Sequence, residues 1–324
     1  MDLADPNFVR SYVIAWNFML EKDLGGGWIG EAGYVGNRAL RLQNRWQTNY
    51  GYIGGGSASQ VLNKKFGRTA GTILSMASGF RSQYDSLQST LQRRFSRGYT
   101  VRLSYTWSKA IGPPGTRNGL DTFQNSTPEY WPLIAHVVQE YDITHNFNAA
   151  VTAELPFGRG KRWATEGFAA ALLGRWQINA LYTGYTGTPF SVTASGTSLN
   201  APGNSQTADQ IKPDVAIFGQ RALWFDTTAY KPVTEVRFGT SGRYQIRGPG
   251  MNNLDLSVYR SFGLTERMRV QFRAEAFNVS NTPHFGTPRA DASGSLFGEI
   301  SGVANTGREG IDERVFRFAL HLDF

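Results

Sequence analysis

The chain contains no cysteine, only four histidines, and 18% charged residues. Without cysteine it has no disulfides, no thiolate metal site and no cysteine nucleophile. The histidines (His136, His145, His284 and His321) lack the spacing of a metal site. The pattern G-x-S-x-G and a complete phosphate-binding loop are also missing, because "FGRGKRW" lacks the full spacing and reads as a basic turn. The sequence therefore predicts no enzyme active site and no cofactor.

Long apolar runs are missing as well. A membrane-spanning helix needs about 18 or more apolar residues, and the most apolar run, "FAAALLG" at 168–174, is far shorter. The opening "MDLADPNFVR" has neither the basic nor the apolar region of a signal peptide. The net charge is +8, but the basic residues are spread among apolar side chains and turns rather than clustered. This distribution predicts no nucleic-acid partner.

The sequence does contain patterns that are typical of β-strands. Nine segments alternate apolar and polar residues with a period of two, which predicts strands. They are 8–21, 28–42, 84–95, 99–110, 141–157, 174–187, 253–262, 267–279 and 314–324. Short or moderate links alternate with four long connections of about 30 to 65 residues, with boundaries good to about 2–4 residues. We expect an antiparallel meander whose neighbours follow sequence order and whose long connections share one rim.

Each strand has one apolar and one polar side. In 99–110, for example, Val101, Leu103 and Tyr105 alternate with Arg102 and Ser104. A lipid-facing band around a wet lumen produces this pattern. The sequence thus predicts an all-β fold: an antiparallel up-and-down transmembrane β-barrel of about nine strands, with short periplasmic turns and long extracellular loops. A soluble β-sandwich also alternates, but its strands are usually only about 5–6 residues long.

Several stretches resemble one family. They are "WNFMLEKDLGGGWIGEAGYVGNRALRL", "YDSLQSTLQRRFSRGYTVRLSYTWSKAI", "RGPGMNNLDLSVYRSF" and "RVQFRAEAFNVSNTPHFGTP". Together they are similar to the C-terminal barrel half of Oar-like TonB-dependent outer-membrane transporters. The resemblance covers about Asn7 to Phe324. It implies that residues 1–324 are the C-terminal portion of such a barrel, and that the plug, the signal peptide and the N-terminal strands are absent from this sequence.

The resemblance also implies a location and partners. The location is the outer membrane of a Gram-negative bacterium, where the partners are outer-membrane lipid, lipopolysaccharide and the barrel-assembly machinery. TonB would act through the plug of the intact parent, which takes up an unidentified large or scarce solute. A passive porin or a surface adhesin barrel is the alternative, and an upstream plug domain would favour the transporter.

The last strand has a particular role in this family. Its strong alternation and terminal aromatic residue resemble the signal that the assembly machinery reads, and the strand then closes the barrel against the first one. The corresponding residues here are Phe316, Phe318, Leu320, Leu322 and Phe324.

The segment 41–80 is basic. It carries Arg41, Arg45, Lys64, Lys65 and Arg68, and no acidic residue occurs between Glu31 and Asp85. Positive potential on an external loop would attract anionic ligands or lipopolysaccharide phosphates. An ordinary solvated loop is the alternative.

Overall fold

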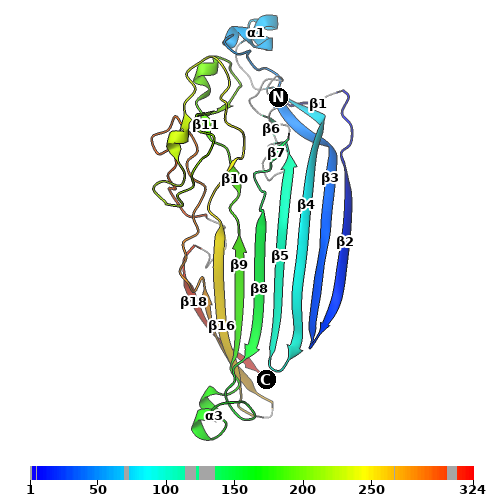
Figure 1. The fold of residues 1–324 in the computed structure, drawn as a ribbon, viewed down its shortest axis with the longest axis vertical. Helices are drawn as coiled ribbons and strands as arrows, with labels where there is room; N and C mark the ends of the chain where they lie inside the picture. The colour runs from blue at the N-terminus through cyan, green and yellow to red at the C-terminus, as the bar shows by residue number, and fades with distance from the viewer. Residues whose placement is uncertain are drawn as a thin grey trace.

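The computed structural model describes residues 2–4, 6–68, 73–113, 122–123, 136–265, 267–304 and 312–324. Its main feature is one large antiparallel sheet of nine long strands (Figure 1). These are β2 (Tyr12–Gly25), β3 (Trp28–Gln47), β4 (Leu74–Ser96), β5 (Tyr99–Gly112), β8 (His145–Glu154), β9 (Gln177–Tyr185), β16 (Met251–Gly263), β17 (Arg269–Phe277) and β18 (Val315–Asp323). Each of them corresponds to one of the nine predicted segments.

The short elements lie in the connections. They are β1 (Asp2–Ala4), η1 (Ser57–Ser59), α1 (Val61–Phe66), β6 (Thr122–Phe123), β7 (Val137–Val138), α3 (Gly167–Leu173), β10 (Pro189–Phe190), β11 (Thr193–Ala194), η3 (Gly196–Leu199), β12 (Gln206–Thr207), β13 (Asp209–Gln210), η4 (Thr227–Ala229), β14 (Tyr230–Lys231) and β15 (Ile246–Arg247). In the described part of the chain, no helix is both long and apolar enough to cross a membrane.

The predicted meander is confirmed. The long strands pair in the order β18-β17-β16-β9-β8-β5-β4-β3-β2, and each neighbouring pair is antiparallel. Three short strands add to the sheet: β1 lies parallel to β4, β6 pairs with β3, and β7 pairs with β5. Strands β2 and β18 are the two ends of this order. The expected closure of the last strand against a first strand is therefore not formed between them.

The connections divide between two rims, as predicted (Figure 1). The β2–β3, β4–β5 and β16–β17 turns and the link that carries α3 lie at the lower end, which we call the turn rim. The segments that carry α1 and β10 to β15 lie at the upper end, the loop rim. The connection after β5 includes 114–121 and 124–135, which lie outside the described residues.

The register sorts the side chains onto two faces because neighbours along a strand point to opposite sides. One cross-strand row is apolar: Val101, Val151, Ala180, Leu256, Ala276 and Phe316. The adjacent row, displaced by one residue, is polar: Thr100, Thr152, Asn179, Ser257, Glu275 and Arg317. Many large apolar side chains on the first face are exposed, including Phe318 and Leu320. The sheet therefore has an uncovered apolar face and an opposite polar face.

Two strands are longer than predicted. Segments 28–42 and 84–95 extend to β3 (20 residues) and β4 (23 residues). The pairing of β3 with β4 shifts register around Leu40 to Gln43, where Arg41 has a positive φ of 55°. An inserted residue of this kind moves the side chains that follow it to the opposite face of the sheet. The period-two pattern of the sequence is interrupted at that point. The sequence signal therefore weakens at the bulge although the strand continues.

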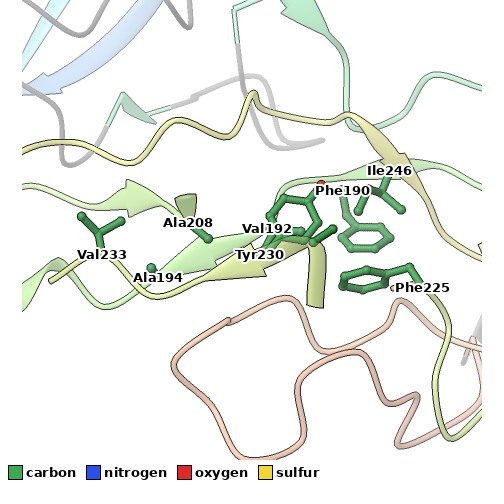
Figure 2. Close-up of a cluster of buried hydrophobic side chains, with 9 residues drawn as sticks. Phe190, Val192, Ala194, Ala208, Phe225, Tyr230, Val233 and Ile246 are labelled. Carbon is green, nitrogen blue, oxygen red and sulfur yellow. The ribbon is translucent and has the colours of Figure 1, made fainter. Parts of the chain in front are cut away.

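The hydrophobic core lies in the connections rather than beneath the sheet. Phe190, Val192, Phe225, Tyr230 and Ile246 are buried together and all come from the 186–250 connection (Figure 2). Phe297, from the connection after β17, packs edge-on against Phe225 with ring centroids 5.3 Å apart. The backbone amide of Thr193 also donates to the Ala290 carbonyl at 2.8 Å. We call the described parts of these connections, 186–250 and 278–304, the loop assembly.

Candidate functional site

The polar face of the sheet contains a shallow groove of about 220 Å³. Its lining includes Arg102, Asn148, Leu181, Thr183 and Asp255. The register places Arg102, Ala150, Leu181 and Asp255 in one row across four strands. At about 4.8 Å between strands, the cation and the carboxylate stand roughly 14 Å apart. The groove therefore offers opposite charges at its two ends.

The Asp255 carboxylate is held in place. It accepts hydrogen bonds from the Asn253 side-chain amide at 2.8 Å and from the Asn278 backbone amide at 2.9 Å. Asn278 is fully buried, and its side chain bonds both the backbone amide and the carbonyl of Thr282. Motif "FNVSNTPHF" therefore turns the chain from β17 into the loop assembly and fixes the acidic end of the groove.

The loop assembly is attached above this face by a buried ion pair. Asp142 has a side chain only 1% exposed, and it pairs with the Arg247 guanidinium. Arg247 also donates to the Asp142 and Gly187 carbonyls, each at 2.9 Å, and the Ala110 amide donates to the Asp142 carboxylate at 2.6 Å. This network links β5 to β15.

The backbone around Arg247 is closely packed. A Cβ atom on Gly187 would lie 1.9 Å from the Gly248 carbonyl oxygen, so only glycine fits there. The motifs "YTGTPF" and "RGPG" thus meet where the loop assembly joins the sheet.

Asp142 corrects the predicted strand 141–157. Alternation within that segment predicts Asp142 on the polar face of the strand, but β8 begins at His145 and Asp142 precedes it. Alternation alone cannot distinguish a wetted carboxylate from one buried by a distant arginine. The only local signal was an acidic residue directly before a strand, in "EYDITH".

A second ion pair lies inside the loop assembly. Arg237 binds Asp209 in a two-point contact, with nitrogen-to-oxygen distances of 2.7 and 2.8 Å, and also pairs with Glu235. The Thr240 backbone amide adds a contact at 3.2 Å. The hydrogen bonds from Arg237 hold the pKa of Asp209 below its usual range, although burial opposes them.

We expect the loop assembly to loosen in acid. A carboxyl whose pKa is lowered by folding stabilises the fold above its unfolded pKa of about 3.9, and this contribution is lost as the pH falls through the folded value. Hydrogen exchange in the loop assembly, corrected for intrinsic rates, should stay flat from about pH 7 to 5 and rise below about pH 4. Lys212 lowers the pKa of Asp226 in the same way. Arg237→Gln should therefore shrink the acid step without abolishing it, and an unchanged step would contradict the assignment to Asp209.

The basic segment differs from its prediction in extent. Arg41 and Arg45 belong to β3, and the loop proper begins after Gln47. Lys64 and Lys65 lie in the last turn of α1, where a positive charge interacts favourably with the negative end of the helix dipole. The Lys64 ammonium also lies over the Tyr52 ring, 4.9 Å from its centroid. These contacts give the lysines a structural role, and the attraction of lipopolysaccharide phosphates stays a prediction.

Three histidines have clear roles in the described structure. The His145 ring, on the apolar face, hydrogen-bonds the Tyr105 hydroxyl at 2.8 Å. His284 is buried, and its Nε2 lies 2.9 Å from the Asn252 carbonyl oxygen. His321 lies 2.9 Å from the Asp323 carboxylate.

The proposed assembly residues form one exposed row at the edge of the sheet. Phe316, Phe318, Leu320 and Leu322 pair in register with Ala276, Ala274, Phe272 and Val270 of β17. Phe324 follows β18 and is 95% exposed. The structure thus places these residues on the apolar face, and their recognition by the assembly machinery stays a proposal.

Comparison with known proteins defines the class. Residues 2–314 match the family described as the outer membrane beta barrel domain. The chain belongs to this family, and its location is the outer membrane. The apolar face is accordingly the lipid-facing side, and the predicted outer-membrane β-barrel class is confirmed over the alternative of a soluble β-sandwich.

A search of solved structures also finds a match to an outer-membrane protein. The outer membrane transporter YddB from Escherichia coli matches with a TM-score of 0.49 and 8% sequence identity. The match covers 98% of this chain and 33% of that chain, so the chain spans about a third of the length of YddB. No curated protein matches the chain.

Proposed function

We propose that this chain is part of the barrel of an Oar-like TonB-dependent transporter that takes up a large or scarce solute. The observation that carries the proposal is the loop assembly. Long connections that build their own hydrophobic core present a fixed external surface, rather than flexible loops, at the loop rim. In outer-membrane barrels the long loops face outward and the tight turns face the periplasm. The assembly is then the first surface that a solute meets.

The polar face supplies the inner wall of the pathway. The groove between Arg102 and Asp255 offers hydrogen-bonding groups and both charges below the loop assembly. The proposed role needs no catalytic step and no cofactor. TonB would supply energy through a plug domain, while lipid, lipopolysaccharide and the assembly machinery are the proposed partners of the outer surface.

Electrical recording separates this proposal from a passive porin. The native gene product, purified from outer membranes, would be inserted into a planar lipid bilayer in potassium chloride. A transporter whose barrel is plugged should give no steady conductance, whereas a porin is an open aqueous channel. The same preparation should bind the purified periplasmic domain of TonB.

Two results would contradict the proposal. Steady conductance without TonB binding would identify a porin. A silent protein that does not bind TonB would favour the adhesin. A control bilayer containing a known porin verifies that the recording detects open barrels.

A further inference from the structure

We propose that the link between β8 and β9, residues 155–176, is a membrane anchor that binds anionic phospholipid in the periplasmic leaflet. This link joins two motifs that the transport function leaves unused: the basic turn "FGRGKRW" and the apolar run "FAAALLG". The inference goes beyond the proposed transport, because it concerns the outer surface at the turn rim.

The link has a defined structure. Trp163 exchanges backbone hydrogen bonds with Pro156 and Gly158, each at 3.0 Å, and its ring packs on Phe157 at 5.7 Å between centroids. Gly158 and Gly174 touch through their backbones, since a Cβ on Gly158 would lie 2.6 Å from the Gly174 Cα. These contacts fix α3 relative to the basic turn.

The end of α3 is attached to the lipid-facing side of the sheet. Arg260 donates to the Leu172 carbonyl at 2.6 Å and also to the Ala171 carbonyl. The Trp176 indole N–H donates to the same Leu172 carbonyl at 3.0 Å. The Trp176 ring packs edge-on against Phe272, which lies on the apolar face. Tryptophan and arginine at such a position are typical of a membrane interface.

The helix α3 projects beyond the turn rim (Figure 1). Several of its large apolar side chains are exposed. Phe168 is 81% exposed, and Leu172, one helical turn later, and Leu173 are also exposed. Ala170, by contrast, is buried against the link. A short helix with such an apolar side, next to basic residues, fits the boundary between headgroups and acyl chains.

The charge around the helix selects the lipid. Residues 155–176 contain four basic residues (Arg159, Lys161, Arg162 and Arg175) and one acidic residue, Glu166, a net charge of +3. Basic residues of this number beside an exposed apolar helix attract the phosphate of a headgroup, so an anionic phospholipid is the occupant that fits.

Site-specific labelling tests the anchor directly. Residues 1–324 contain no cysteine, so Phe168→Cys in the native gene product gives a single site within this part of the chain for an environment-sensitive fluorophore. The labelled protein is reconstituted in phosphatidylethanolamine vesicles with or without phosphatidylglycerol, and quenching by nitroxide-labelled lipid is measured. The matched control is Phe66→Cys, since Phe66 is also helical and exposed (66%) but lies at the loop rim.

We expect several-fold stronger quenching by interfacial nitroxide at position 168 than at position 66, rising further with phosphatidylglycerol. Arg159→Glu combined with Arg162→Glu should remove the increase caused by phosphatidylglycerol. Equal quenching at the two positions, or no effect of phosphatidylglycerol, would overturn the proposal. So would a label at position 168 that is shielded in detergent and insensitive to lipid, because another protein segment would then cover the helix.

Discussion

Phe324→Asp in the native gene product is expected to reduce folded barrel in the outer membrane far more than lipid energetics can explain. Phe324 continues the lipid-facing row of Phe316, Phe318, Leu320 and Leu322. At the turn rim it lies near the interface, where a charge on the lipid face costs about 0–1 kcal/mol. One kcal/mol corresponds to roughly a fivefold change in an equilibrium. A larger defect therefore indicates recognition of this residue during insertion.

The neighbouring residue provides the control. Asp323 lies on the opposite, polar face and pairs with His321 at 2.9 Å, and both side chains are well exposed. An exposed pair contributes about 0–1 kcal/mol, so Asp323→Asn should leave assembly nearly unchanged. The measurement is the amount of heat-modifiable barrel in purified outer membranes for each variant. If Phe324→Asp and Asp323→Asn both reach the wild-type amount, Phe324 has no role in assembly.

Arg247→Ala is expected to release the loop assembly from the sheet. The substitution leaves the Asp142 carboxylate buried without its main cation, because Lys109 lies 3.9 Å away and is half exposed. Breaking a buried pair costs about 3–5 kcal/mol, and we expect about 3 because Arg247 keeps part of its surface in water. Opening should then become on the order of 100-fold more frequent.

Hydrogen exchange measures this opening locally. Two informative amides are Gly248, which donates to the Thr188 carbonyl, and Ala208, which donates to the Val192 carbonyl. Lys212→Ala is the control, because it breaks an exposed pair with Asp226 in the same assembly and should cost at most about 1 kcal/mol.

A double substitution tests the mechanism. The variant that combines Asp142→Asn with Arg247→Met lacks both charges, so no unpaired charge remains buried. The amides of its loop assembly should exchange more slowly than those of the Arg247→Ala variant. Equal exchange in Arg247→Ala and Lys212→Ala would show that the pair does not hold the assembly.

Local sequence determined the sheet. In a strand with one apolar and one polar side, the polarity of each residue indicates which face of the sheet its side chain lies on, as for Val101 and Arg102. This assignment needs no information about distant residues. Tight turns such as Ser96 to Tyr99 also make each strand pair with the strand that precedes it in the sequence. The number, order and orientation of the long strands were therefore readable, and so was the distribution of connections between the two rims.

The tertiary structure decided everything that depends on distant partners. The burial of Asp142 by Arg247 and the packing of Phe297 against Phe225 join residues from separate connections. The bulge at Arg41 depends on how β3 pairs with β4. The sequence of an irregular connection has no repeating apolar and polar pattern, so it does not indicate which side chains become buried. Likewise the run "FAAALLG" indicated only that it was too short to cross a membrane, and its position on the lipid side comes from Arg260, about 90 residues later. A residue's own face follows from the local backbone, whereas its burial and charge partner follow from which segments meet.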